Sequence, residues 1–325
     1  MGKTLLEVKD LEVSFYNKKK ETPAIRKISY TLDEGEVLGI VGESGSGKSV
    51  SSHSILQLLP DNGRIKGGQI FFEGKDITKM SKKEMSDLRG NQISMIFQDP
   101  MTSLDPLFTI GYQLEEALKK HTKLDRKARQ DRMLELLTLV GINQPERRLK
   151  QYPHEFSGGM RQRAMIAMAL SCNPKLLIAD EPTTALDVTI QAQIVDLLKE
   201  LKQKLNMSII FITHDLGVVS DICDKIIVMY AGEIVETGTK RQIFYENRHP
   251  YTEGLLKSIP KLDQPRDTEL VPIEGTPPDM SKLGPECAFA HRCRYAMQIC
   301  AKSEPPCVDL DDTHSVSCWK CLKKD

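Results

Sequence analysis

The stretch Gly42-Glu43-Ser44-Gly45-Ser46-Gly47-Lys48-Ser49 decides the fold of this 325-residue chain. It follows the pattern Gly-x-x-x-x-Gly-Lys-Ser/Thr, in which glycines let backbone N–H groups surround a phosphate. Residues 36–41 before it are typical of a short buried strand. Residues 50–59 after it contain neither Gly nor Pro and predict a helix. A strand, a Gly-rich turn and a helix start together predict a nucleotide-binding loop.

Side chains in and near this loop have predicted roles in nucleotide binding. Lys48 would reach the terminal phosphates, and the Ser49 hydroxyl would bind Mg²⁺. Phe15 and Tyr16 lie at the end of an earlier predicted strand, where an aromatic ring could stack on an adenine. The alternative for these two rings is a place in the core. A Gly/Ser linker that contains a lysine by chance would not explain the flanking strand and helix, so we predict a nucleotide site.

The composition is that of an ordinary globular protein, with 40% hydrophobic residues, 28% charged residues and a formal net charge of zero. The balanced charge gives no electrostatic reason to expect a nucleic-acid partner. No apolar run is long enough for a membrane span, and the first residues lack the apolar core of a signal peptide. We therefore expect a cytoplasmic chain.

Six of the eight cysteines follow residue 286. In a reducing compartment, such clustering favours a metal site over disulfides.

Hydrophobic spacing predicts an alternation of strands and helices before residue 245. Apolar runs and two-residue alternation predict strands, whereas apolar positions three and four residues apart predict helices. The predicted strands cover residues 5–16, 25–32, 36–41, 68–72, 92–97, 175–179 and 208–213, with a hairpin at 226–230 and 233–237; the predicted helices cover residues 50–59, 113–140 and 190–205.

Polar side chains follow two of the later strands. Asp180 and Glu181 come after the strand at 175–179, and His214 comes after the strand at 208–213. Ligands of α/β sheets lie beyond the carboxyl ends of the strands. Asp180 would hold Mg²⁺ directly or through water, and Glu181 would polarise an attacking water. A lone histidine is usually structural, but the position of His214 at a strand end favours a catalytic role.

A second anion-binding helix start is predicted at Ser157-Gly158-Gly159. Ser157 is a good N-cap residue, and the two glycines leave backbone N–H groups uncovered. The apolar-rich run at 164–170 follows directly and is suited to the body of a helix. The sequence therefore contains two separate segments that are suited to phosphate binding.

In this order, the motifs resemble those of the ATP-binding subunit of an ABC transporter. The resemblance covers roughly residues 5–245 and implies an α/β fold, namely an ABC-type P-loop NTPase cassette with a RecA-like core. It also implies an antiparallel β-subdomain and an inserted α-helical subdomain at about residues 100–172, within a nucleotide-binding domain of residues 1–245. The Walker A, Q-loop, signature, Walker B, D-loop and H-loop motifs of that family are matched by residues 42–49, Gln98, Ser157-Gly158-Gly159-Met160, Asp180-Glu181, Ala185-Leu186-Asp187 and His214.

The family resemblance also implies how these motifs act. Two cassettes pair head to tail, and the Walker A loop of one and the signature motif of the other hold ATP until hydrolysis releases them. Gln98 would couple the γ-phosphate and Mg²⁺ to the membrane partner, His214 would contact the γ-phosphate, and Asp187 would belong to the nucleotide site. This sequence has Phe156 and Met160 where the family motif reads Leu-Ser-Gly-Gly-Gln. The Ser-Gly-Gly centre is kept, so we expect activity to persist.

Finer motifs resemble the oligopeptide/dipeptide importers, and most of all their D-type ATP-binding subunits. The resemblance implies an ATPase that powers peptide import at the cytoplasmic face of a bacterial cell membrane. Its implied partners are a second ATPase subunit, identical or different, two transmembrane permeases and an extracytoplasmic peptide-binding protein. Nickel and glutathione importers share this subfamily and stay open as alternatives. The motifs are residues 97–104, residues 157–163, His249-Pro250-Tyr251-Thr252, and Gly275-Thr276-Pro277-Pro278 followed by Cys287-Ala288-Phe289.

A soluble ABC-type ATPase that acts on nucleic acid or ribosomes is an alternative from a different class. Such proteins typically fuse two cassettes, or insert coiled coils or zinc modules. This chain has one set of cassette motifs, no long heptad run and no net positive charge. The sequence therefore favours the transporter subunit, with no nucleic-acid partner.

Residues 246–325 are predicted to form a Pro- and Cys-rich C-terminal extension. Its prolines, which include Pro265, are consistent with an extended segment that wraps the domain or a partner. Some relatives hold a [4Fe–4S] cluster on the pattern Cys-x5-Cys-x6-Cys-xn-Cys, and Cys287, Cys293 and Cys300 match its first three positions. Four thiolates are the ligand set of such a cluster. The family pattern His-x-Val-x-Cys is matched at residues 314–318 and indicates Cys318 as the fourth ligand.

Three alternatives stay open for these cysteines. They could bind zinc, for example through Cys318 and Cys321. They could be free thiols, or Cys307 could replace Cys318 as a cluster ligand. A cluster could also serve as a redox-regulated switch alongside the motor. Cys172 and Cys223 lie in apolar contexts and are expected to be buried core thiols.

Overall fold

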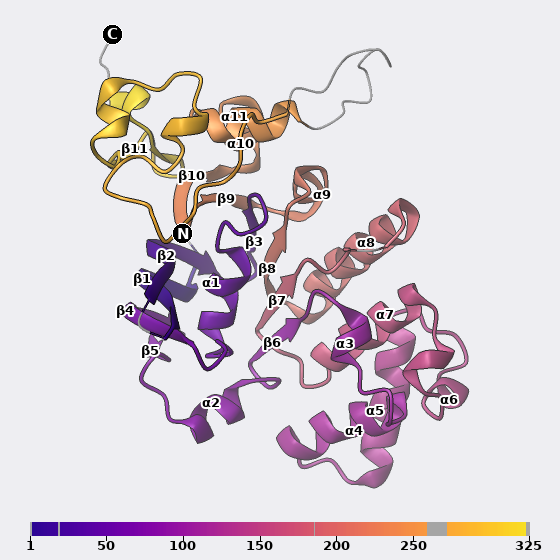
Figure 1. The fold of residues 1–325 in the computed structure, drawn as a ribbon. Coiled ribbons are helices and arrows are strands. Elements are labelled where there is room, and N and C mark those ends of the chain that lie inside the picture. Colours follow the sequence, from indigo (N-terminus) through magenta and orange to yellow (C-terminus); the bar gives the residue numbers. More distant parts are fainter. Residues whose placement is uncertain (1, 19, 185, 259–271, 323–325) are drawn as a thin grey trace. The chain divides into compact units, whose positions relative to one another are not determined.

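The computed structural model describes residues 2–18, 20–184, 186–258 and 272–322 (Figure 1). Pro265 of the extension and Ala185 of the predicted D-loop lie outside these residues. The chain divides into two compact units. The helical unit consists mainly of Asp33–Glu36 and Lys79–Ile212, and the phosphate-loop unit consists of Lys3–Leu32, Val37–Thr78 and Thr213–Asp325. The predicted division into residues 1–245 and 246–325 stays a prediction.

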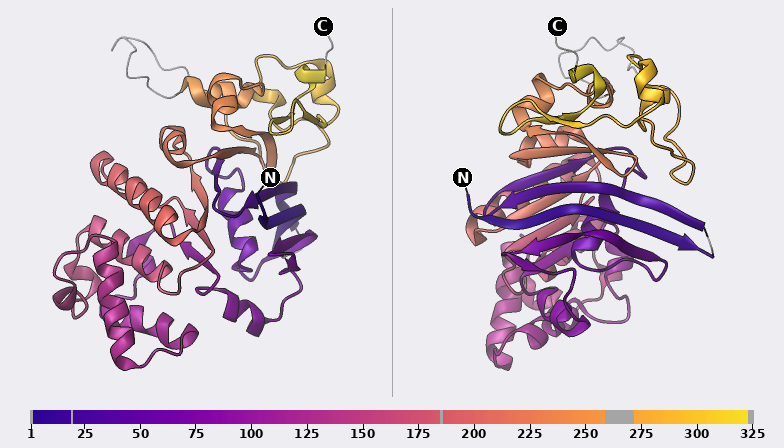
Figure 2. Two further views of the ribbon diagram at one scale, coloured as in Figure 1. Left: turned by 180° about the vertical axis from the view of Figure 1, so that it is seen from behind. Right: turned by 90° about the vertical axis from the view of Figure 1, so that its left-hand side faces the viewer.

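An antiparallel sheet forms the first half of the phosphate-loop unit, with strand order β2-β1-β4-β5. Its two longest strands lie side by side in Figure 2. The apolar residues Leu6, Val8, Leu11 and Val13 of β1 are buried, whereas Lys9 and Asp10 are exposed, so one face of the strand lies against a core. The predicted strands at 5–16, 25–32 and 68–72 are confirmed, and all three are longer than predicted. The bounds are β1 Thr4–Asn17, β2 Lys20–Asp33, β4 Gly63–Phe72 and β5 Lys75–Asp76.

The rest of this unit is built around the strand order β11-β12-β10-β9-β3. β3 is parallel to β9, whereas β9 and β10 form the predicted hairpin around Ala231 and Gly232, both of which have positive φ. β12, from the C-terminal extension, pairs with β10. The elements are β3 Val37–Val41, α1 Lys48–Ile55, α9 Leu216–Ile222, β9 Lys225–Tyr230, β10 Glu233–Thr239, α10 Lys240–Tyr245, α11 Pro250–Lys257, β11 Cys307–Asp309 and β12 Ser315–Ser317, with 3-10 turns at Ala290–Arg292, Gln298–Ala301 and Trp319–Leu322.

The helical unit contains three parallel strands, in the order β8-β7-β6, and most of the helices. Every residue of these strands is buried, as expected for parallel strands covered on both faces. Over the described ranges, no helix of either unit is long and apolar enough to cross a membrane. The elements are α2 Lys82–Leu88, β6 Ile93–Ile96, α3 Pro100–Ser103, α4 Ile110–His121, α5 Arg126–Leu139, α6 Pro145–Arg148, a 3-10 turn at Pro153–Glu155, α7 Gly158–Ala169, β7 Leu176–Asp180, α8 Val188–Leu205 and β8 Ser208–Thr213.

Two predicted helices differ from the structure. The single helix expected at 113–140 is wrong, because α4 ends at His121 and α5 starts anew at Arg126. The Asp125 side chain accepts a hydrogen bond from the Ala128 N–H and caps the second helix. The helix expected at 50–59 begins at Lys48 and ends at Ile55, shortly before Gln57 adopts a positive φ of 49°. The left-handed conformation of Gln57 is incompatible with continued helix.

Candidate nucleotide site and cysteine pocket

The turn between β3 and α1 wraps tightly because three glycines adopt positive φ angles. These angles are 153° at Gly42, 79° at Gly45 and 101° at Gly47, which caps α1. A Cβ atom at Gly42 would lie 2.2 Å from the Met229 carbonyl oxygen, so only glycine fits there. The loop therefore has the strand–turn–helix geometry that the motif predicts.

Polar groups converge inside this loop. Lys48 is only 5% exposed, and its ammonium donates hydrogen bonds to the carbonyl oxygens of Gly42 and Glu43 at 2.8 and 2.9 Å. The buried Ser46 hydroxyl has no hydrogen-bond partner among the described residues. A buried lysine and an unpaired buried hydroxyl in one Gly-rich turn are suited to an anionic ligand. The roles predicted for Ser44 and Ser49 stay predictions.

The helix that follows the loop is fixed to the antiparallel sheet by a buried hydrogen bond. Tyr30 of β2 and Ser51 of α1 share this bond, with 3.1 Å between their hydroxyl oxygens. Burial raises the pKa of Tyr30 to about 12, because the phenolate would lose its hydration. The start of α1 is thus held by an interaction outside the loop itself.

Phe15 and Tyr16 lie at the end of β1 and are both half-buried. The Phe15 ring packs against Gly63, where a Cβ atom would come within 2.8 Å of the ring. The Tyr16 N–H donates to the Asn62 carbonyl oxygen at 2.8 Å. Phe15 is therefore involved in strand packing, and stacking of either ring on an adenine stays a prediction.

In the helical unit, two side chains from the segments that follow β6 and β7 donate hydrogen bonds to the Glu181 carboxylate. Its Oε2 atom accepts hydrogen bonds from the Gln98 amide and the Thr184 hydroxyl, both at 2.9 Å. Glu181 has a positive φ of 47°, and its N–H donates to the carbonyl oxygen of Ile212 in β8. Asp180, the last residue of β7, is 3% exposed. A non-glycine residue with positive φ at a strand end is typical of functional sites.

The predicted second helix start is observed at α7. The Ser157 side chain caps it by accepting a hydrogen bond from the Met160 N–H at 3.4 Å. A Cβ atom at Gly158 would meet no atom within 4 Å, so this part of the backbone is uncovered. The departure at Phe156 has a packing reason, because that ring is 97% buried and lies 5.9 Å from the Arg148 guanidinium.

Asp187 and His214 are both exposed. Asp187 directly precedes α8, and His214 directly follows β8. Asp187 caps α8 and accepts a hydrogen bond from the Ile190 N–H at 2.9 Å. His214 follows β8 directly, as predicted. Both side chains are accessible, and their nucleotide-binding and catalytic roles stay predictions.

The sequence interpretation missed residues that hold the phosphate loop from the C-terminal part of the chain. The Tyr251 hydroxyl accepts a hydrogen bond from the Glu43 N–H at 2.8 Å, and the Arg292 guanidinium binds the Glu43 carboxylate. Tyr251 was part of the His-Pro-Tyr-Thr motif, but nothing in the sequence indicated its contact. Burial raises the pKa of Tyr251 well above its usual range.

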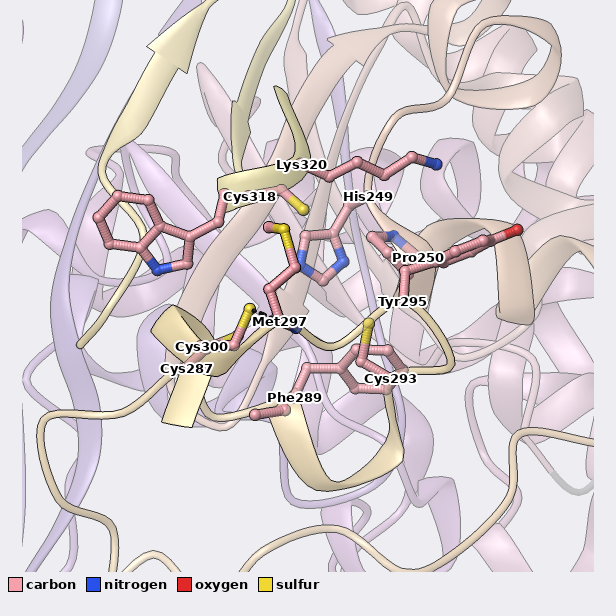
Figure 3. Close-up of a pocket in the computed structure, with 12 residues that line it drawn as sticks. His249, Pro250, Cys287, Phe289, Cys293, Tyr295, Met297, Cys300, Cys318 and Lys320 are labelled. Atoms are coloured by element: carbon pink, nitrogen blue, oxygen red, sulfur yellow. Dashed lines mark hydrogen bonds between the residues drawn. The ribbon is translucent and has the colours of Figure 1, made fainter. Parts of the chain in front are cut away.

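Four cysteines line a second pocket in the phosphate-loop unit. They are the four predicted cluster ligands, and aromatic side chains including Phe289, Tyr295 and Trp319 line the same pocket. Figure 3 shows the cysteines at the border of this pocket, together with Met297 and His249. Cys307 lies exposed in β11, and neither it nor Cys321 is among the lining residues. The four cysteines are Cys287, Cys293, Cys300 and Cys318.

The thiols of this pocket lie close enough to influence one another, and Cys300 is buried whereas the other three are half-buried. Burial, together with a smaller effect of the neighbouring cysteines, raises the pKa of Cys287 to about 11. The pKa values of Cys293 and Cys318 are raised for the same reasons. Across the described ranges, no group of three or more His, Cys, Asp or Glu residues is arranged to hold a metal ion. Cys223 is buried and Cys172 half-buried, so the predicted core position is confirmed for Cys223 and only partly for Cys172.

Comparison with known families and proteins identifies close relatives. Residues 25–184 match the family model "ABC transporter", and residues 235–300 match "Oligopeptide/dipeptide transporter, C-terminal region". The chain is 58% identical to the oligopeptide transport ATP-binding protein OppD of Bacillus subtilis, over 97% of this chain and 88% of the relative. It is 54% identical to the dipeptide transport ATP-binding protein DppD of the same organism, over 97% and 94%.

Solved structures agree with this assignment of the fold. The ATP-binding cassette MJ0796, solved as a dimer in a post-hydrolysis state with ADP and Pi, matches with a TM-score of 0.66 and 28% identity. That match covers 73% of this chain and 99% of the cassette. CbiO1 of Clostridium perfringens, part of the transporter complex cbiONQ, matches with a TM-score of 0.65 and 31% identity, over 75% and 92% of the two chains.

Proposed function

The chain belongs to the family of ATP-binding subunits of oligopeptide and dipeptide ABC transporters, and from this premise we propose that it hydrolyses ATP to power peptide uptake. The observation that supports the chemistry best is the Gln98–Glu181 hydrogen bond of 2.9 Å, because it orients a carboxylate at the end of a buried strand. The phosphate loop would bind the phosphates of ATP, with Lys48 and the backbone N–H groups of the glycines as its anion-binding groups.

The residue roles follow from this chemistry. Glu181 would accept the proton of the attacking water, and Gln98 would orient Glu181 and contact the Mg²⁺. Asp180 and Ser49 would bind the Mg²⁺, and His214 would contact the γ-phosphate. The exposed Ser157-Gly158-Gly159 backbone and Asp187 serve the ATP of a partner cassette, whose own signature motif completes the site of this chain. ATP and Mg²⁺ are the cofactors that this motif set requires.

The proposed assembly places the chain at the cytoplasmic face of a bacterial membrane. It comprises a second ATPase subunit, two permeases and an extracytoplasmic peptide-binding protein. The high identity to oligopeptide and dipeptide transport ATP-binding proteins, together with the match of residues 235–300, supports a peptide cargo.

Uptake measurements in cells test the cargo. Cells that lack this chain receive either the wild-type gene or the Glu181→Gln variant, and uptake of a labelled dipeptide, a labelled tetrapeptide, ⁶³Ni²⁺ and labelled glutathione is measured. We expect peptide uptake to return with the wild type only. Restoration of nickel or glutathione uptake without peptide uptake would contradict the proposed cargo while leaving the ATPase assignment intact.

The four pocket cysteines are proposed to hold a [4Fe–4S] cluster. Such a cluster takes four thiolate ligands, which Cys287, Cys293, Cys300 and Cys318 would supply. These four cysteines line one pocket, whereas Cys307 and Cys321 do not, and this supports the proposed ligand set. When bound, the cluster can take up or release one electron. Iron and sulfide analysis of protein purified without oxygen tests the proposal, since zinc or no metal would contradict it.

A further inference from the structure

Arg292 lies in the turn between two of the pocket cysteines, yet its side chain reaches the phosphate loop. The guanidinium is 4% exposed, and each of its five N–H groups has an acceptor. Two of them donate to the two carboxylate oxygens of Glu43, at 2.6 and 2.9 Å. The other three donate to the Tyr230 hydroxyl and to the carbonyl oxygens of Ile273 and Glu274.

Glu43 carries this contact into the loop. Its carbonyl oxygen accepts hydrogen bonds from the Lys48 ammonium at 2.9 Å and from the Ser46 N–H at 3.2 Å. Its own N–H is held by the Tyr251 hydroxyl at 2.8 Å. A continuous series of contacts therefore runs from Arg292 through Glu43 to the lysine that is expected to bind phosphate.

The charge of Glu43 requires such a partner. The phosphate-loop motif leaves this position open to any residue, and a carboxylate there would repel the phosphates of a nucleotide. The bidentate pair neutralises the carboxylate and fixes its direction at the same time. The rings of Tyr230 and Phe289 lie 5.7 and 5.9 Å from the guanidinium carbon and hold the arginine in place.

We propose that Arg292 is a positioning residue of the nucleotide site, through which the cysteine-bearing segment sets the affinity of the phosphate loop for nucleotide. Arg292 touches no phosphate. It keeps the Glu43 backbone and the Lys48 ammonium in their binding positions and cancels the negative charge beside them. Any change that displaces the turn Ala290–Arg292 therefore reaches the nucleotide site through one ion pair.

Calorimetric titration of the purified full-length chain with Mg-ADP tests this role. Arg292→Gln keeps hydrogen-bonding groups but loses the charge, and we expect its dissociation constant to rise about tenfold. The KM for ATP rises in parallel, whereas kcat at saturating ATP stays within about twofold of wild type. The control is Arg294→Gln, because Arg294 lies two residues away and pairs with Glu253 instead. We expect this variant to bind Mg-ADP like the wild type.

A double-mutant cycle with Glu43→Gln separates coupling from general loss of structure. The two substitutions act on one ion pair, so their effects should not add, and the double variant, which lacks the uncompensated carboxylate, should bind Mg-ADP at least as tightly as Arg292→Gln. Unchanged Mg-ADP affinity in a folded Arg292→Gln protein would overturn the proposal, as would fully additive losses. If Arg292→Gln does not fold, Arg292→Lys decides, because it keeps the positive charge but loses the bidentate contact with Glu43. Wild-type Mg-ADP affinity in that variant would overturn the positioning role.

Discussion

The Gln98 amide and the Glu181 carboxylate are joined by a hydrogen bond of 2.9 Å, although 83 residues separate them in the sequence. The Thr184 hydroxyl donates to the same carboxylate oxygen. Two donors on one oxygen restrict the direction of the carboxylate. The Q-loop residue and the proposed catalytic base therefore act as one unit within the helical unit.

Replacing Gln98 by Ala should lower ATP turnover more than ATP binding. The carboxylate loses a donor that orients it, so we expect kcat to fall about tenfold, which is part of the roughly 10²–10⁴-fold that positioned acid–base catalysis contributes in total. Steady-state kinetics of the purified chain measure this. Thr184→Val removes the second donor and should give a smaller effect of the same kind. Equal kcat for Gln98→Ala and wild type would exclude the orienting role.

Two glycines of the phosphate loop should respond differently to alanine. At Gly42 the new methyl group would collide with the Met229 carbonyl oxygen, whereas at Gly45 it meets no atom within 4 Å. Gly45→Ala is strained only by its positive φ and should cost about 1 kcal/mol of unfolding free energy. Gly42→Ala should cost at least about 3 kcal/mol or abolish Mg-ADP binding. Urea unfolding and Mg-ADP titration of both variants compare them, and equal effects would contradict the structure of the loop.

Tyr30 should make the chain less stable at alkaline pH. The pKa of the folded phenol is about 12, above the ordinary value of 10.0, because the ring is buried. The contribution is fully present below pH 10 and is lost as the pH rises toward 12, at up to about 1.4 kcal/mol per pH unit.

Urea unfolding of wild type and Tyr30→Phe between pH 7 and 11.5 measures this contribution. Phe cannot ionise, so the difference in unfolding free energy between the two proteins should shrink above pH 10. Tyr245→Phe is the matched control, since Tyr245 is 84% exposed and should show no such trend. A constant difference between wild type and Tyr30→Phe across this range would refute the prediction.

Substitution of single cysteines should distinguish the proposed cluster ligands from the other thiols. Cys300→Ser removes one of the four pocket thiols, and we expect the iron content of anaerobically purified protein to fall to half or less. Cys307→Ser changes an exposed thiol outside the pocket and should keep the wild-type iron content. Iron loss in Cys307→Ser but not in Cys300→Ser would assign the ligands differently.

The parts of the fold that can be predicted from the sequence are those determined by residues close together in the chain. Residues 42–49 predict their own loop, because only glycine allows the close approach of the backbone there. The strand at 208–213 and the hairpin at 226–237 are predicted because their apolar runs and their Ala231-Gly232 turn are continuous in sequence. The prediction of one helix at 113–140 is wrong because the helical spacing of apolar residues continues across the gap between α4 and α5. Asp125, a favoured N-cap residue, marks the start of the second helix in the sequence.

The contacts that the sequence could not predict join distant residues. Arg292 and Glu43 are 249 residues apart, and the motif gives no preference at position 43. The φ angle of Glu181 depends on the strand partners around it, since its N–H binds the carbonyl oxygen of Ile212. The convergence of four cysteines on one pocket was predicted from a family pattern, and the spacing alone left Cys307 and Cys321 as alternatives.

ATP turnover by the Glu181→Gln variant is the measurement that tests the central claim most directly. The substitution keeps the shape of the side chain but removes the proton acceptor, so turnover should fall about 10²-fold or more while Mg-ATP still binds. Glu200→Gln, at an exposed position of α8, should hydrolyse ATP at the wild-type rate. Wild-type turnover by Glu181→Gln would contradict the assignment of this carboxylate as the catalytic base of an ATP-driven transporter subunit.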